Sequence, residues 1–524
     1  MFNVNKMNFS IKYSYVTILG TLILLLTSCN DLEEAVYSDI PSDKFYSNEK
    51  EMIMSMGSAY TNLRGSYAQI WGHIGLNTIA SDEAIIPYRE ENLWWDGGVW
   101  IDLAKHNFYP ALDPVSNPWS MAFEGVTKCN MILKQFEESP IQFDGKDGLI
   151  DELKILRAWY LYTALDLYGD IPVVTSFDNA DLPSRMPRQE AWDFVVTEIT
   201  SGVSTLEPYT TATNYGRMTQ AAAYATLAKL YLNSDVWFGI PKWQEVIDAC
   251  DAIIDMNYYI LEPNYFDNFK PDNENSRENI WCIIFDRIMT QGWWNAFQMH
   301  NFTLHTLSQQ TFDMPAFCWD GIAATEAHYN LYDATDIRIN SWLEGQQYAS
   351  DGSPLYYTAT RPLVYTPYVH ALDDFDDPAG LFDGVRCVKW MYEPGILDNQ
   401  SMSNDFAIYR YSDILLMKAE ALMRQNGGVA NTEAVALVNQ VRERAYGDNS
   451  GNYTVNSLTL EELLKERSRE LAWEGWRRQD QIRFGTWLNP WKFKTVSSEH
   501  LKLYPVPYWE ITANPNLTQN EGYQ

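Results

Sequence analysis

Tryptophan-rich segments are the residues of this sequence best suited to bind a ligand. The chain has 20 tryptophans, and aromatic residues make up 14% of its 524 residues. Adjacent or nearly adjacent rings occur in Pro87–Trp100, Gln291–Asn295 and Phe317–Gly321. Because the apolar face of a pyranose stacks on a flat aromatic ring, exposed aromatic residues in loops favour a carbohydrate ligand.

Local sequence around these rings predicts how they are presented. Asp96-Gly97-Gly98 is typical of a turn, so the neighbouring tryptophans are expected on loops. Arg89 could donate paired hydrogen bonds to sugar hydroxyls or to a uronate. Any one of these rings could instead pack in the core or against a partner. The predicted ligand contacts are Trp71, Tyr88, Arg89, Trp94, Trp95, Trp293, Trp294 and Trp319.

Catalysis would require a different pattern of residues. Glycoside hydrolysis needs two carboxylates that face each other across a cleft, about 5–10 Å apart. The carboxylates nearest the aromatic segments belong to Asp82, Glu90, Glu91 and Asp320. The sequence has no HExxH, GxSxG, Walker or GxGxxG pattern. We therefore expect no catalytic residues and no cofactor, and a glycoside hydrolase is the less favoured alternative.

Metal-binding patterns are also weak. The acidic stretch 373–377 offers the oxygen ligands that calcium prefers, but it lacks the spacing and the glycine of a calcium loop. A solvated loop is the prediction there. Apart from Cys29, the five cysteines are widely spaced and form no CxxC, so we expect buried thiols and neither zinc nor a disulfide framework.

The net charge of −31 excludes some ligand classes. Nucleic acids and anionic lipids are bound by basic surface patches. A chain with so large an excess of acidic residues is not expected to form such patches. The predicted partners therefore include no nucleic acid.

Amphipathic helices are the elements that must hold these loops in place. Helical periodicity extends over 152–168, 189–206, 220–233, 243–256, 412–424, 432–444 and 460–473. The helices come in adjacent pairs, with small residues alternating with large ones, which resembles degenerate tetratricopeptide packing. Long irregular stretches are expected at about 39–111 and 263–409. The sequence thus predicts a mainly α fold in which helical repeats support a loop-rich face.

The N-terminal segment predicts export. Lys6 and Lys12 precede a short apolar run, which ends at Leu26-Thr27-Ser28-Cys29. This arrangement is typical of a secretory signal and resembles the lipobox of bacterial lipoproteins. Residues 1–28 would be removed and Cys29 acylated. Residues 30–34 resemble the acidic export tag on surface lipoproteins of the Bacteroidetes. The alternative is an ordinary secreted protein in which Cys29 is incidental.

Five sequence blocks together resemble the SusD/RagB family of outer-membrane nutrient-binding lipoproteins. They lie in family order and extend to the C-terminus. The blocks are residues 157–172, 216–219 with the helix after them, 409–421, 466–485 and 504–523.

The resemblance implies a single SusD-like domain over 29–524, with four tetratricopeptide helix pairs that support a large ligand-binding face. It also implies a non-enzymatic glycan receptor that is anchored in the outer membrane only through lipid on Cys29 and faces the cell exterior. Its partner would be a SusC-like TonB-dependent transporter. A RagB-like peptide receptor and a purely structural scaffold remain alternatives.

Charged residues inside the blocks are interpreted as structural. Arg157, Arg410, Arg469 and Asp480 lie beside apolar helical faces, where arginine commonly pairs with a carboxylate. Glu466, Glu470 and Glu474 recur every four residues, and such a stripe predicts an ion-pair network.

Overall fold

A computed structural model describes residues 46–523, except for residues 93, 179–180, 316 and 397–400. The predicted signal segment, Cys29 and the acidic tag lie outside the described residues. Of the helices in the described part of the chain, none combines the length and the apolar composition that crossing a bilayer requires.

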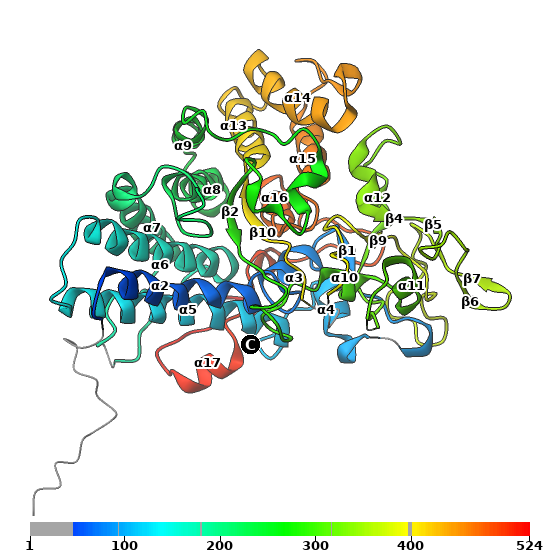
Figure 1. The fold of residues 1–524 in the computed structure, drawn as a ribbon, viewed down its shortest axis with the longest axis horizontal. Coiled ribbons are helices and arrows are strands. Elements are labelled where there is room, and N and C mark those ends of the chain that lie inside the picture. Colours follow the sequence, from blue (N-terminus) through cyan, green and yellow to red (C-terminus); the bar gives the residue numbers. More distant parts are fainter. Residues whose placement is uncertain (1–45, 93, 179–180, 316, 397–400, 524) are drawn as a thin grey trace, which may run out of the picture.

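The described residues form mainly α-helices with short strands between them (Figure 1). The helices are α2 (Glu49–Ser66), α3 (His73–Thr78), α4 (Val99–Lys105), α5 (Asp113–Glu138), α6 (Lys146–Tyr168), α7 (Arg188–Gly202), α8 (Gln220–Phe238), α9 (Trp243–Ile254), α10 (Met299–Thr303), α11 (Gln309–Phe312), α12 (Glu326–Tyr329), α13 (Tyr411–Gln425), α14 (Thr432–Tyr446), α15 (Leu460–Glu470), α16 (Arg477–Arg483) and α17 (Tyr508–Ala513).

The strands make two-stranded antiparallel sheets with the pairings β1–β3, β2–β10, β4–β9, β5–β8 and β6–β7. Their bounds are β1 (Ala84–Ile85), β2 (Asn279–Ile283), β3 (Ala323–Ala324), β4 (Trp342–Leu343), β5 (Gly345–Gln346), β6 (Tyr356–Thr358), β7 (Arg361–Pro362), β8 (Val364–Tyr365), β9 (Arg386–Cys387) and β10 (Phe406–Arg410).

The long helices form a layer of packed neighbours. In this layer α5 packs on α6, α6 on α7, α8 on α9, and α13 on both α9 and α14. Close approach depends on small residues: a Cβ added at Gly125 of α5 would lie 2.5 Å from the ring of Tyr160 in α6. Figure 1 shows α2, α5, α6 and α7 side by side, while β4–β7, β9, α11 and α12 gather on the opposite side. The predicted mainly α, tetratricopeptide-like fold is confirmed.

Seven predicted helices are present, with small differences at their ends. The last one was predicted to reach Trp473, but α15 ends at Glu470. Trp473 has a φ of 58°, in the left-handed region, and Gly475 follows with a φ of 83°. A right-handed helix cannot continue through such residues, so the chain turns there.

The irregular stretch expected over 39–111 is wrong in its first part, because α2 occupies eighteen residues of it. Buried Met52, Met56, Ala59 and Leu63 recur at helical spacing along α2, and the Asn48 side chain caps its first turn. Helix α5 was also missed, because prolines lie near its start. Residues 263–409 do carry only short strands and helices of five residues or fewer.

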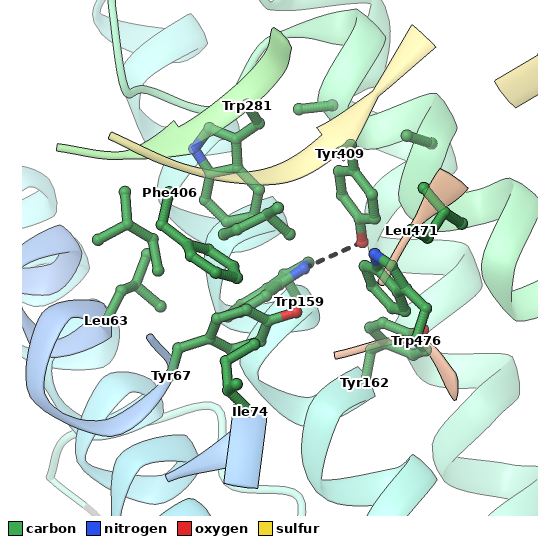
Figure 2. Packing of buried hydrophobic residues seen from close by; sticks show 14 of the residues in the cluster. Leu63, Tyr67, Ile74, Trp159, Tyr162, Trp281, Phe406, Tyr409, Leu471 and Trp476 are labelled. Atoms are coloured by element: carbon green, nitrogen blue, oxygen red, sulfur yellow. Dashed lines mark hydrogen bonds between the residues drawn. The ribbon is translucent and has the colours of Figure 1, made fainter. Parts of the chain in front are cut away.

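An aromatic core joins the helical layer to the β2–β10 ribbon (Figure 2). The indole N–H of Trp159 in α6 donates a hydrogen bond to the hydroxyl of Tyr409 in β10, at 3.1 Å. Trp159 meets Trp281 of β2 edge-on, with ring centroids 5.0 Å apart, and Tyr409 stacks on Trp476 at 5.6 Å. Because large rings from four segments are buried together, the irregular region 263–409 (the loop half) is held in a fixed position on the helices.

A buried network of arginines and carboxylates also links the two halves. Arg338, just before β4, donates to Glu466 at 2.8 Å and to Glu470 at 3.0 Å, both in α15. Arg410, at the end of β10, donates to Glu470 at 2.9 Å and to Glu474 at 2.9 Å. The side chains of Arg338, Arg410, Glu466 and Glu470 are 0% exposed. The predicted ion-pair network is therefore confirmed.

Other polar side chains are also buried in the core. The cysteines at 129, 250, 282, 318 and 387 are free and buried, as predicted. Glu83 is 1% exposed, and its carboxyl accepts a hydrogen bond from the backbone N–H of Trp473 at 3.1 Å. Burial raises the pKa of Glu83 to about 8.

Candidate functional site

Three of the predicted tryptophans come together from distant parts of the chain. Trp319 lies 6.1 Å from Trp94 and 5.6 Å from Trp293, measured between ring centroids. Phe317, which is 57% exposed, adds a fourth ring 5.1 Å from Trp319. The three indole rings are half-buried. We call Trp94, Trp293, Trp319 and Phe317 the tryptophan platform.

Phe302 of α10 packs against two rings of the platform. Its ring lies 5.3 Å from Trp94 and 6.0 Å from Trp293, and it is 1% exposed. Buried rings that hold partly exposed rings in place reduce the freedom that a ligand would otherwise have to remove. The platform is therefore preorganised.

Backbone hydrogen bonds tie the loop of Trp319 to α10. The N–H of Trp319 donates to the carbonyl of Asn301 at 2.8 Å, and the N–H of Gly321 donates to that of Phe302 at 3.0 Å. A Cβ added at Gly321 would lie 2.5 Å from Cζ3 of Trp94 and 3.1 Å from the carbonyl oxygen of Phe302. Glycine at 321 thus lets the Trp94 ring lie directly on this loop.

Arg89 does not lie where the prediction placed it. It is 1% exposed, and its guanidinium donates to the carbonyls of Gly380 at 3.0 Å, Asp383 at 2.8 Å and Gly321 at 3.3 Å. Burial, and then the nearby charge of Arg386, lower the pKa of Arg89 to about 9. Arg89 therefore fastens the platform loop from beneath, and we correct its assignment as a ligand contact.

The carboxylates that a hydrolase would require are each held by another side chain. The pairs are Asp82 with Arg477, Glu90 with Arg361, Glu91 with Tyr357, and Asp320 with Arg386.

Tyr88 and Trp95 belong to a second group of rings. Trp95 lies 5.2 Å from Tyr88 and 5.3 Å from Phe375, which is 58% exposed. We call these three residues the Phe375 group. Gly97 and Gly98 have φ values of 68° and 95°, so the turn predicted after Trp95 is present.

Trp71 and Trp294 lie outside both groups. Trp71 meets the buried Trp100 edge-on at 4.5 Å, and Trp100 in turn lies 6.1 Å from Trp94. Trp294 is 51% exposed, and its backbone packs beside Gly65 of α2. Within the described part of the chain, the ring of Trp294 contacts no other aromatic ring.

Residues Phe302, Phe317 and Phe375 were missed as individual site residues. Phe317 lies in a segment already singled out, so its neighbour Trp319 could have indicated it. Phe375 lies inside the acidic stretch 373–377, where Asp374 accepts hydrogen bonds from the backbone N–H groups of Asp376 and Asp377. This turn projects the aromatic ring, and an apolar ring among charges was the available signal.

Metal binding has no candidate in the described residues, since no three or more histidine, cysteine, aspartate or glutamate side chains come together there as a metal site would require.

Comparison with protein families identifies two matching models. One, described as "SusD family", matches residues 262–523. The other, described as "Starch-binding associating with outer membrane", matches residues 32–232.

Two relatives by sequence are the starch-binding protein SusD of Bacteroides thetaiotaomicron and the SusD-like protein P25 of Formosa agariphila. The first is 25% identical over 426 residues, which cover 71% of this chain and 72% of the relative. The second is 24% identical over 547 aligned positions, which cover 96% of this chain and 98% of the relative.

Solved structures share the fold. Surface glycan-binding protein A from Bacteroides thetaiotaomicron superposes with a TM-score of 0.74 and 21% identity, over 91% of this chain and 100% of that one. The complex of that protein with laminarihexaose superposes with a TM-score of 0.71 and 20% identity, over 90% of this chain and 100% of the other. SusD and surface glycan-binding protein A are both named as binding proteins. Since one family model spans half of the sequence and the other most of the remainder, the chain belongs to the SusD family.

Proposed function

We propose that this protein is a cell-surface glycan-binding lipoprotein that captures an oligosaccharide or polysaccharide on the tryptophan platform. The observation that carries the proposal is the convergence of Trp94, Trp293, Trp319 and Phe317 within 5.1–6.1 Å along their ring contacts. Relatives named for binding starch and laminarin support the same ligand class.

The arrangement of the platform suits several consecutive sugar units. Rings from three loops, held at angles of 54° to 82° to one another, offer stacking faces in different directions. A curved chain meets such a surface better than a flat sheet of parallel rings would. With Arg89 buried, the arginine expected to pair with a uronate is not available, so the platform favours neutral glycans.

Affinity electrophoresis tests the proposal. The soluble chain 30–524 would be run through gels that contain plant, fungal or host polysaccharides, beside Trp319→Ala and Trp293→Ala. We expect one neutral glycan to retard the wild type, and each variant to lose most of that retardation.

Trp509→Ala is the matched control. Trp509 lies on α17, is 69% exposed and belongs to neither ring group, so its loss removes an exposed tryptophan without touching the platform. Retardation that stays at the wild-type level in both platform variants would refute the site. If no glycan retards the wild type but peptides bind the platform, a RagB-like peptide receptor replaces the proposal.

We further propose that the protein is anchored in the outer membrane through lipid on Cys29, and that it delivers its glycan to a SusC-like TonB-dependent transporter. The lipobox-like segment before Cys29 supports the anchor. Labelling of cells with a palmitate analogue should mark the wild type, and Cys29→Ala should be unlabelled and released from membranes. Co-purification of a transporter with the anchored protein tests the partner, and its absence would contradict delivery.

A further inference from the structure

A pocket lies beside a tight turn near the C-terminus. It has a volume of about 320 Å³ and lies between α12 and residues Trp491–Phe493. Its lining shares no residue with the tryptophan platform. We call it the turn pocket. Ligand sites commonly have volumes of about 300–1,000 Å³, so this pocket is at the small end of that range. It suits a small molecule or a short segment of a longer chain.

The turn that carries the pocket wall is firmly held. Trp491 and Lys494 exchange two backbone hydrogen bonds, at 2.9 and 3.0 Å. The ammonium group of Lys494 is buried and donates to the carbonyl of Asn489 at 2.8 Å and to the hydroxyl of Ser497 at 2.9 Å. Because Lys494 fastens the turn, its tip can present Trp491 and Phe493 without first becoming ordered.

The walls and floor of the pocket are apolar. The rings of Trp491 and Phe493 lie 5.5 Å apart at an angle of 82°, and both are half-buried. Ile85 and Val369, which are 1% and 2% exposed, form the floor. Two rings at right angles above an aliphatic floor offer surfaces for the C–H faces of a sugar.

The rim carries both donors and acceptors. Glu326 and Asn330 come from α12 and the residue after it, and Lys492 faces them from the turn. The ammonium of Lys492 lies 3.5 Å from the Glu326 carboxylate, and both side chains are solvent-accessible, at 37% and 42%. A polyol needs this mixture, because each hydroxyl both donates and accepts a hydrogen bond.

Charge at the pocket argues for a neutral ligand. Lys492 is offset by Glu326, and the carboxylate of Asp82 at the pocket edge is paired with Arg477 at 2.6 and 2.7 Å. No excess of positive charge remains among these groups to attract a uronate or a phosphate.

From this combination we infer that the turn pocket is a second carbohydrate site, which binds a short stretch of the same neutral glycan as the platform. The inference rests on the proposed function for its ligand class. The pocket and the Phe375 group pack against one small apolar core, which includes Ile85, Ile101 and Val369. A polysaccharide long enough to reach from the turn pocket to the platform is held at both sites, while a short oligosaccharide occupies one site at a time.

The experiment compares long and short ligands on the soluble chain 30–524. Laminarin, starch, xylan and galactomannan serve as long probes, with polygalacturonate as the acidic one. The hexasaccharides of the retained polymers are the short probes. Trp491→Ala and Asn330→Ala should weaken binding of the long neutral polymer about tenfold or more, since they remove one of two linked contacts. Polygalacturonate should not bind.

Platform variants separate the two proposals. In Trp293→Ala/Trp319→Ala, weak binding of the hexasaccharide should remain and should disappear when Trp491→Ala is added. Binding that is lost in the platform variant and unchanged by Trp491→Ala and Asn330→Ala would overturn the second site but leave the proposed function intact. No binding of any probe by the wild type would overturn both. Asn330 is an exposed residue outside the core, so its variant stays informative even if Trp491→Ala disturbs the turn.

Discussion

Gly321→Ala should weaken glycan binding although residue 321 presents no side chain to a ligand. The new Cβ would lie 2.5 Å from Cζ3 of Trp94, whereas ordinary contact begins at 3.4 Å. The Trp94 ring must therefore move by about 1 Å or more, because the other near atom, the carbonyl oxygen of Phe302 at 3.1 Å, belongs to the backbone. One displaced aromatic contact is worth about 0.5–1.5 kcal/mol, which corresponds to roughly a twofold to tenfold weaker affinity.

Isothermal titration with the glycan retained in the electrophoresis panel measures this loss. Gly57→Ala is the matched control, because a Cβ at Gly57 meets nothing within 4 Å. Thermal unfolding of both variants shows whether the fold survives, and overpacking at 321 should lower the free energy of unfolding by about 1–3 kcal/mol. Wild-type affinity in folded Gly321→Ala would refute the view that the placement of Trp94 matters to the ligand.

Three other predictions test the fold. Glu470→Gln should lower the free energy of unfolding by about 3–5 kcal/mol, because it leaves buried arginines without their carboxylate; Glu499→Gln, at an exposed ion pair, should change it little. Gly125→Ala should cost about 1–3 kcal/mol, because its Cβ meets the Tyr160 ring. Glu83→Gln should change the pH dependence of stability. With its pKa raised to about 8 from the ordinary 4.5, folded Glu83 keeps a proton that the unfolded chain releases, so wild-type stability falls between pH 4.5 and 8 and the advantage of the variant grows across that window.

Melting temperatures from scanning fluorimetry check all three. Equal melting temperatures for Glu470→Gln and Glu499→Gln would contradict the role of the buried network. An unchanged melting temperature for Gly125→Ala would mean that α5 and α6 can move apart at no cost. A difference between wild type and Glu83→Gln that stays constant from pH 5 to pH 8 would show that Glu83 is not protonated in the folded protein.

Periodicity predicted most of the helical layer because its helices have long, regular apolar faces. Helix α2 could have been predicted in the same way, from the spacing of its buried methionines and Leu63. The end of α15 could not, since the left-handed conformation of Trp473 is imposed by the chain around it: its backbone N–H bonds to Glu83, 390 residues away in sequence.

The sequence indicated the aromatic candidate residues but not how they divide into two groups. Trp94 and Trp95 are adjacent, yet Trp94 joins the platform and Trp95 joins the Phe375 group. Because residue 321 has no Cβ, the Trp94 ring can lie against the loop that carries Trp319, a contact between segments more than two hundred residues apart. The burial of Arg89 could not be predicted either, since its carbonyl partners at Gly380 and Asp383 lie about three hundred positions further along the chain.

The buried network of Arg338 and Arg410 has a practical consequence for finding the ligand. It fastens the loop half to α15, so the loops cannot melt while the helices persist without leaving charges unpaired in the interior. A sugar that binds only the loop face must then stabilise the whole molecule, by about 2.7 kcal/mol at a hundred times its dissociation constant. Melting curves of the unmodified protein, recorded with each oligosaccharide of a plate, can therefore reveal the ligand without a label or a mutation.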